Sequence, residues 1–314
     1  MLHFKSHIQC ILFSVLILAS INSKAASCCA GGGGQSICIL SSEQKYQFGM
    51  ASSYREIAGH FDPYGNYSAS GSGNSTSTLT TVFGGAYRIG EDWQFALNLP
   101  FVNNQKEFSN IKSSASGLGD PTIEGRFLLW EDLNFLTYRP ALTFYGGISL
   151  PFGKSIYTSK EASEVDVTGD GYSTMHVGAN AAKLFRPVNF VIDASYYYPM
   201  SKNVSEMHGS PVDSYTIRAG NKFQIVESAT YLFSEKLSSG IGFKQAWQFE
   251  STVNNSAVAG SASRIVSNIV SLNYFHDLST SFSFSYETPA VFEQYLANQP
   301  QSQTISLAIS YGGL

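Results

Sequence analysis

The residues that could carry covalent or metal chemistry in this sequence begin with three closely spaced cysteines, Cys28, Cys29 and Cys38. In an exported chain, Cys28 or Cys29 can form a disulfide with Cys38 and leave one thiol over. Two alternatives remain open. Lipid attachment at Cys28 would lack the usual Leu-like residue three positions earlier, and a soft-metal site of three thiolates would lack a nearby His or fourth Cys. We predict one disulfide among these cysteines and no metal site.

Candidate catalytic groups are sparse. His60 and Asp62 share one predicted loop, and His208 and Asp213 share another. Hydrolases built on membrane barrels use His with acids or Ser, but no characteristic sequence surrounds a nucleophile here. Asp166–Gly171 resembles part of a calcium loop but lacks its alternating acids and closing Glu. We therefore predict no catalytic residues and no cofactor.

The element that would position the other polar side chains is best seen in Trp93–Phe101, WQFALNLPF. Every second residue is large and apolar, and the residues between are polar or small. A period of two indicates a β-strand with one apolar face. About nine residues also suffice for a tilted strand to cross a bilayer.

Much of the chain repeats this unit, with a turn or loop between copies. The predicted strands are Lys45–Tyr54, Thr76–Ile89, Trp93–Phe101, Leu118–Trp130, Tyr138–Leu150, Tyr172–Leu184, Asn189–Met200, part of Ser214–Phe233, Leu237–Glu250, Arg264–Phe275, Thr280–Glu287 and Gln303–Tyr311. Ser214–Phe233 is too long for one crossing, so we expect it to project beyond the membrane or contain a bulge. The phase of Arg264–Phe275 is ambiguous between Ile265/Ile269 and Val266/Val270/Leu272/Tyr274.

The strand number is even, and the connections alternate between long and short, as in bacterial outer-membrane barrels. An open sheet edge cannot be satisfied in lipid, so such strands must close on themselves. We predict an all-β protein: a transmembrane antiparallel up-and-down β-barrel of about twelve strands over residues 43–314. A soluble two-sheet sandwich would not explain the aromatic residues near the strand ends. The chain departs from the usual aromatic C-terminus, because Gly312-Gly313-Leu314 follows Tyr311.

Composition agrees with an exported barrel. Only 13% of residues are charged, against about 25% in soluble proteins. Residues 1–25 resemble a cleaved signal peptide, with Lys5, the apolar core Ile11–Ala19, and Ser23 and Ala25 before the cut. Residues 26–42 form a flexible Cys/Gly-rich segment that hangs in the periplasm or folds into the lumen as a plug.

These features predict a location in the outer membrane of a Gram-negative bacterium. The expected partners are the lipid bilayer, the outer-membrane assembly machinery and a small-molecule solute. Removing the signal takes away two lysines and no acids, so the net charge falls below the −4 of the full chain. A negative chain argues against nucleic acid as a partner.

If the apolar strand faces meet lipid, charged residues on the opposite faces line the lumen. The candidates are Glu124, Arg126, Asp193, Arg218, Lys222 and Lys244. Two interpretations stay open: a polar pore lining, or mutual ion pairing that fills the interior, as in narrow barrels.

Three segments occur in the order of a known family pattern: Gly90–Val102 (GEDWQFALNLPFV), Gly117–Leu129 (GLGDPTIEGRFLL) and Gly146–Gly153 (GGISLPFG). They resemble outer-membrane proteins of the transporter family named for the MetA pathway of phenol degradation. Pro151-Phe152-Gly153 departs slightly, because a small hydroxyl residue is commoner in the middle. The resemblance implies an outer-membrane barrel that moves small, often apolar or aromatic compounds, and it implies no catalytic residues.

Gly117–Pro121 suits the entry to a strand, because Gly permits unusual backbone angles, Asp can accept a nearby backbone N–H, and Pro needs no ladder donor. It could be a barrel-shaping turn or a constriction lip at the base of a loop.

The leading functional hypothesis is a passive channel for small molecules. The alternative is a surface structural or adhesive barrel with a filled lumen and functional outer loops, and the third is a barrel-borne hydrolase.

Overall fold

The computed structural model describes residue 40 and residues 44–71, 73–132, 138–207, 210–277, 279–290 and 298–313. Within them, no helix is long and apolar enough to cross a membrane. The three cysteines Cys28, Cys29 and Cys38 and the predicted signal at residues 1–25 lie outside the described residues.

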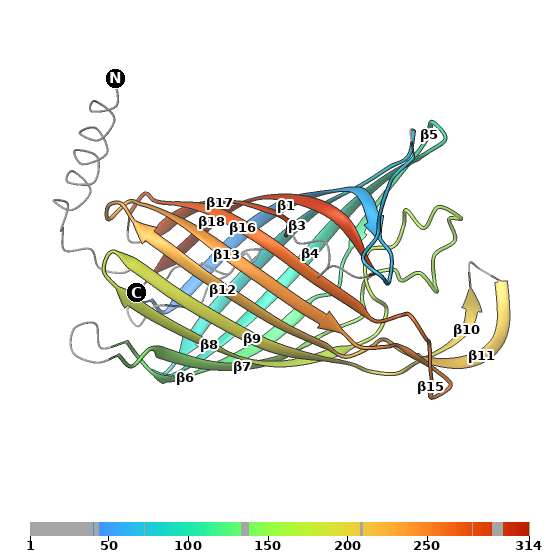
Figure 1. The fold of residues 1–314 in the computed structure, drawn as a ribbon. Coiled ribbons are helices and arrows are strands. Elements are labelled where there is room, and N and C mark those ends of the chain that lie inside the picture. The colour runs from blue at the N-terminus through green and yellow to red at the C-terminus, as the bar shows by residue number, and fades with distance from the viewer. Residues whose placement is uncertain are drawn as a thin grey trace, which may run out of the picture.

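The described chain forms a closed antiparallel barrel of twelve strands, which confirms the predicted architecture (Figure 1). In chain order the strands are β1 (Tyr46–Phe61), β3 (Ser75–Ile89), β4 (Trp93–Phe108), β6 (Thr122–Trp130), β7 (Ala141–Ser149), β8 (Thr174–Phe185), β9 (Val188–Pro199), β12 (Lys222–Leu232), β13 (Leu237–Gln248), β16 (Ser263–Phe275), β17 (Thr280–Pro289) and β18 (Gln299–Gly313). Each pairs with the next, and β18 returns to pair with β1.

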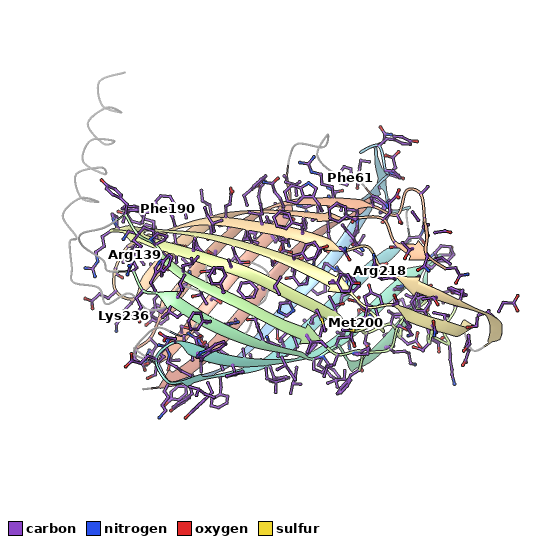
Figure 2. All side chains as sticks on the ribbon, turned by 90° about the horizontal axis from the view of Figure 1, so that it is seen from below. Phe61, Arg139, Phe190, Met200, Arg218 and Lys236 are labelled. Atoms are coloured by element: carbon purple, nitrogen blue, oxygen red, sulfur yellow. The ribbon has the colours of Figure 1, made fainter. Side chains whose placement is uncertain are left out.

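The two faces of the barrel wall differ as the period of two requires. On β4 the alternate residues Trp93 to Phe101 are exposed, whereas Gln94 and Ala96 between them are buried. On β16, Val270, Leu272 and Tyr274 are exposed and Ile269 is buried, which favours the second phase, although Val266 of that set is also buried. Side chains project outward over the whole surface of the wall (Figure 2).

The two ends of the barrel are also different. Short turns such as Gly90–Asp92 and Ser234–Lys236 gather at the end where β1 begins and β18 finishes. Figure 2 shows Arg139 and Lys236 at this end, and Met200 and Arg218 at the opposite one. Because bacterial barrels have short periplasmic turns and long outer loops, we call the first the periplasmic end and the second the outer end.

The outer end holds strands that the sequence pattern did not predict. The predicted loop at 55–75 contains an extension of β1 and the strand β2 (Tyr67–Ala69), and the loop at 103–117 contains an extension of β4 and the strand β5 (Ile111–Leu118). The predicted loop at 201–213 contains β10 (Lys202–Met207) and the start of β11 (Ser210–Arg218). The predicted loop at 251–263 contains β14 (Thr252–Val253) and β15 (Ser256–Ala257). These segments lie beyond the apolar belt, so pairing there needs no alternation. At the β4–β5 turn, Ser109 and Asn110 both have positive φ, which is typical of a tight hairpin.

The long predicted strand Ser214–Phe233 is divided into β11 and β12 around Gly220. A Cβ atom at Gly220 would lie 1.7 Å from the carbonyl oxygen of Phe249. Only glycine permits this approach, so the chain leaves the barrel wall at that point.

The glycines at the end of β18 fit the closure of the barrel. Gly313 lies opposite Tyr46 in the β1–β18 ladder, and a Cβ atom at Gly313 would lie 2.5 Å from the Tyr46 hydroxyl. The glycine therefore leaves space for the ring of the first strand.

One acidic side chain interrupts the apolar outer face. Glu227 on β12 is exposed and pairs in register with Ile192 and Phe243, which share that face. It lies four residues from Phe223, whose ring stacks on Trp247 near the outer end. It lies the same distance from Tyr231, which contacts Phe233 near the periplasmic end. Glu227 is thus midway between the aromatic residues that mark the two membrane interfaces.

We expect Glu227→Leu to raise the free energy of unfolding by about 1–2 kcal/mol, because an acid on the lipid face costs more than a leucine there. Urea titration of the protein folded in lipid vesicles measures this change. Glu287→Leu is the control: Glu287 is inward and paired with Lys244, so its loss should destabilise. A less stable Glu227→Leu barrel would show that the carboxylate is satisfied in the membrane.

Candidate functional site in the barrel interior

Charged and polar side chains gather on the inward face of β6, β7, β8 and β9. Glu124 forms an ion pair with Arg126 on its own strand, and Glu124 Oε2 lies 3.0 Å from His176 Nε2 on β8. Arg126 and His176 are each only 7% exposed. A single carboxylate therefore holds two potential cations in place, which satisfies buried charges that would otherwise be costly.

A second carboxylate continues this group. Asp193 Oδ1 accepts a hydrogen bond from the Tyr145 hydroxyl at 2.7 Å, and Asp193 Oδ2 accepts one from Asn180 Nδ2 at 3.2 Å. The His176 ring lies 6.3 Å from that of Tyr145 and 5.6 Å from that of Tyr197, measured between centroids. We call these residues, Glu124, Arg126, Tyr145, His176, Asn180, Asp193 and Tyr197, the wall cluster.

Two inward-facing glycines make room for the rings of the wall cluster. A Cβ atom at Gly147 would lie 2.7 Å from His176 Cε1, and one at Gly178 would lie 2.3 Å from Tyr145 Cζ. The rings can therefore lie flat along the wall instead of projecting across the lumen. Gly147 belongs to the Gly146–Gly153 segment of the family pattern, so part of that pattern shapes the lumen.

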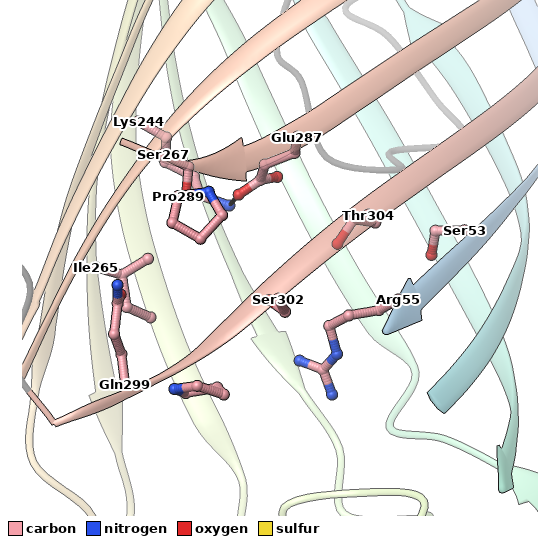
Figure 3. A pocket seen from close by; sticks show the side chains of 11 residues that line it. Ser53, Arg55, Lys244, Ile265, Ser267, Glu287, Pro289, Gln299, Ser302 and Thr304 are labelled. Carbon is pink, nitrogen blue, oxygen red and sulfur yellow. Dashed lines mark ion pairs between the residues drawn. The ribbon is translucent and has the colours of Figure 1, made fainter. Parts of the chain in front are cut away.

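The opposite part of the wall holds a second charged group. Lys244 on β13 forms an ion pair with Glu287 on β17, and Arg55 on β1 lies on the same cavity. The cavity has a volume of about 240 Å³ and is also lined by serines, Thr304, Ile265 and two prolines. Figure 3 shows Arg55 and the Lys244–Glu287 pair approaching this space from different strands. Polar and apolar groups thus face one space.

The six residues predicted to line the lumen lie in different places in the structure. Glu124, Arg126 and Asp193 meet in the wall cluster, and Lys244 lies at the cavity. Lys222 is also inward, with its Nζ 4.1 Å from the centroid of the Tyr197 ring, a cation–π distance. The prediction that Arg218 lines the lumen is wrong. Its guanidinium donates to the hydroxyl of Tyr198, whose ring is on the outer face. Arg218 can reach that ring because β11 has left the barrel wall.

Six interior residues are not among the sequence predictions: His176, Tyr145, Asn180 and Tyr197 of the wall cluster, and Glu287 and Arg55 at the cavity. His176 and Tyr145 lie in correctly predicted strands, and the alternation of those strands predicts that both side chains face the lumen. Glu287 is the last residue of the predicted strand Thr280–Glu287. The sequence predicts a loop at Arg55 because the alternation of apolar residues stops at Tyr54, whereas β1 continues to Phe61.

The long connection between β7 and β8, residues 151–173, lies inside the outer mouth, and we call it the inner loop. Inward-facing side chains of β4 hold its backbone. Asn104 Nδ2 donates to the carbonyls of Val165 at 3.2 Å and Val167 at 2.6 Å, and Lys106 Nζ donates to that of Ser163 at 2.6 Å. The loop therefore occupies part of the cross-section of the mouth.

The Gly117–Pro121 motif anchors the inner loop. The carboxylate of Asp120 accepts backbone N–H groups from Gly153 and Asp170, both at 2.7 Å. Thr168 Oγ1 donates to the carbonyl of Leu118 at 2.8 Å. Burial and the Asp120 carboxylate raise the pKa of Asp170, and the nearby ammonium of the inward-facing Lys222 partly offsets this rise. The motif thus fixes the inner loop to the barrel wall, next to the inward-facing Lys222.

Asp166 fixes the shape of the inner loop. It accepts a hydrogen bond from Lys154 Nζ at 2.8 Å and another from the buried Ser159 hydroxyl. Burial opposes ionisation, but these bonds outweigh it and lower the pKa of Asp166 to about 2. Asp166 therefore has a structural role within the loop.

One of the candidate catalytic acids has a structural role in an outer turn. Asp62 Oδ1 accepts the backbone N–H groups of Tyr64 and Asn66 at 2.8 Å, which closes a turn. His208 lies outside the described residues. Among the residues described, no three His, Cys, Asp or Glu side chains are grouped as a metal site would need.

Comparison with solved structures supports the fold. The COG4313 outer membrane channel from Pseudomonas putida F1 superposes with a TM-score of 0.70 at 12% identity, over 88% of this chain and 99% of that one. The translocator domain of the autotransporter NalP from Neisseria meningitidis gives 0.48 at 10% identity, over 98% and 96%, and we draw nothing from that looser overlap. No curated protein matches the sequence.

A family model matches residues 60–308, which covers most of the chain and every element of the wall cluster and the inner loop. This range contains all three segments that carried the sequence resemblance. The chain therefore belongs to the family described as the MetA-pathway of phenol degradation.

Proposed function

We propose that the protein is a passive channel for small molecules in the outer membrane of a Gram-negative bacterium. The observation that carries this proposal is a closed barrel whose inward face bears charged groups around a cavity of about 240 Å³. A barrel that served only as a scaffold could fill its interior with packed side chains. Family membership and the likeness in fold to an outer-membrane channel support the same conclusion.

The cavity suggests the class of solute. An apolar cavity of roughly 150 Å³ is enough to hold benzene, so one aromatic ring fits the space at Arg55. Ile265 and the two prolines offer contact to a ring, and Arg55 with the Lys244–Glu287 pair offers partners for a polar substituent. We infer that small aromatic compounds with one polar group pass, which agrees with the phenol in the family's name.

The proposal includes the route to the membrane. Residues 1–25 would be removed as a signal peptide, and the outer-membrane assembly machinery would insert the barrel. A disulfide within Cys28, Cys29 and Cys38 remains a prediction for the segment that follows the signal.

Planar-bilayer recordings of the refolded protein test the channel. We expect steady current steps that are interrupted when phenol is added, because a ring bound near Arg55 obstructs ions. Ethanol, a hydroxyl without a ring, is the control solute. Arg55→Ala should weaken the phenol effect. Folded protein that gives no current in any condition would contradict the channel and favour a structural barrel with a filled lumen.

The wall cluster gives a second prediction. Glu124→Gln leaves Arg126 and His176 without their carboxylate, so we expect the barrel to lose about 3 kcal/mol of stability and the current to become more selective for anions. Urea titration and the reversal potential in a salt gradient measure the two effects. Glu227→Gln, which changes a carboxylate on the outer face, should leave the selectivity unchanged; an equal shift in both variants would refute a role for the cluster in the lumen.

The inner loop gives a pH-dependent prediction. Because Asp166 has a pKa near 2, below the usual value of 3.8, its bonds stabilise the loop fully above about pH 4 and are lost as the pH falls toward 2. We expect the current to be constant from pH 7 to 5 and to rise below pH 4. Asp166→Asn should show the low-pH current already at pH 7.

Asp277→Asn is the matched control for that experiment. Asp277 also has a lowered pKa, owing to the backbone N–H groups of Ser279 and Thr280, but it lies in a periplasmic turn. A current that rises equally in both variants, or that stays constant below pH 4, would mean that the inner loop does not narrow the mouth.

A further inference from the structure

Arg55 offers its guanidinium to the lumen. It lines the cavity, whereas its neighbour Tyr54 is exposed on the outer face, so the side chain of Arg55 points into the barrel. That side chain is itself exposed, and its accessible surface therefore belongs to the lumen. Within the described part of the chain, no hydrogen bond or direct ion pair holds the guanidinium. An anion can therefore bind Arg55 without first breaking an existing pair.

Strand register keeps Arg55 apart from the carboxylate of Glu287. Thr304 on β18 pairs with Arg55 on one side and with Glu287 on the other, so one strand separates the two charges, or about 9–10 Å between their backbones. Glu287 acts on Arg55 over that distance, but its direct ion pair is with Lys244. Among the described residues that line the cavity, two are cations and one is a carboxylate, which leaves one positive charge in excess.

Apolar surface lies on the other side of the cavity. Figure 3 shows Ile265 and Pro289 on the left of the space and Arg55 on the right, and β18 separates β17 from β1. Pro289 pairs with Ser267, which is two positions from Ile265 and shares its inward face. The cavity of about 240 Å³ is larger than the roughly 150 Å³ that holds benzene. A ring and one small substituent therefore fit between the apolar side and Arg55.

We propose that this cavity is a binding site for an aromatic carboxylate, with the ring against Ile265 and Pro289 and the carboxylate on the Arg55 guanidinium. A planar guanidinium can donate two parallel hydrogen bonds to a carboxylate, which a single hydroxyl cannot accept in that way. The excess positive charge favours an anion over a neutral molecule of the same shape. The role of the site in passage rests on the proposed function, whereas the binding itself does not.

Ligand binding tests the charge preference without any current. Isothermal titration calorimetry of the folded barrel in detergent at pH 7 compares benzoate with benzamide, which has the same ring and a similar shape but no charge. We expect benzoate to bind roughly tenfold more tightly, because a hydrogen bond to a charged group contributes more than a neutral one. Arg55→Gln should remove this preference and leave the affinity for benzamide unchanged. Equal affinities for the two ligands in the unchanged protein overturn the proposal.

Lys222→Met is the matched control for Arg55→Gln. Lys222 is also an inward cation, but its ammonium lies over the Tyr197 ring and is not part of the cavity lining. Its loss should reduce the affinity for benzoate far less than the loss of Arg55. An equal reduction in the two variants would mean that the general charge of the lumen selects the anion, and it would overturn the site. Faster migration of unheated samples on gels shows that each variant is folded.

Two further measurements address the other parts of the site. Glu287→Gln releases Lys244 from its ion pair, so the affinity for benzoate should rise and that for benzamide should stay the same. A lower affinity for benzoate in the folded variant would contradict the assigned charge balance. Acetate, a carboxylate without a ring, should bind more weakly than benzoate, and equal affinities would overturn the contact with Ile265 and Pro289.

Planar-bilayer recordings separate this inference from the proposed channel. In a conducting barrel, benzoate should interrupt the current at a lower concentration than benzamide, and Arg55→Gln should remove the difference. A steady current that both compounds interrupt equally overturns the carboxylate site and leaves the channel. Preferential binding of benzoate by a folded barrel that gives no current overturns the channel and supports the site.

Discussion

The rest of this structure depends on the requirement that no backbone N–H or C=O be left unpaired in hydrocarbon. Each unpaired group there would cost several kcal/mol, so the first strand must find the last. The ladder from Tyr46 opposite Gly313 to Phe61 opposite Gln299 meets that need. The glycines at the end of β18 follow from it, because the closing strand must accommodate the ring of Tyr46.

Closure then determines where chemistry can occur. Since side chains alternate along every strand, the lipid takes one set and the interior receives the other. Polar residues that the lipid face excludes accumulate inside, where they must satisfy one another. The wall cluster is one result, and the glycines beside Tyr145 and His176 keep its rings against the wall. At opposite ends of β4, the inward-facing Asn104 bonds to the inner loop and the inward-facing Gln94 bonds to the backbone of Leu40.

The sequence predicted the membrane-spanning part well because lipid imposes a simple rule on it. Alternation alone predicts a strand at Trp93–Phe101, and the same alternation predicts the other strands of the barrel wall. The rule does not apply beyond the apolar belt, because β5, β10 and β11 are paired strands without an apolar face. For the same reason the sequence wrongly predicts Arg218 in the lumen, although β11 leaves the barrel wall at Gly220. It also cannot show which inward residues meet. The pairing of Glu124 with His176 depends on strand register, and the hold of Asp120 on the inner loop joins positions far apart in the chain.

The pairing of β1 with β18 also has a kinetic consequence. Most ladders here join neighbours in sequence and can form as hairpins, but this one joins the two extremes of the barrel and carries the greatest loop-closure entropy. Until β18 arrives, both edges of the sheet expose unpaired backbone groups that could template pairing with another chain. The chain is therefore most prone to aggregation after its other strands have paired, and the fifteen residues of β18 determine whether it becomes a barrel.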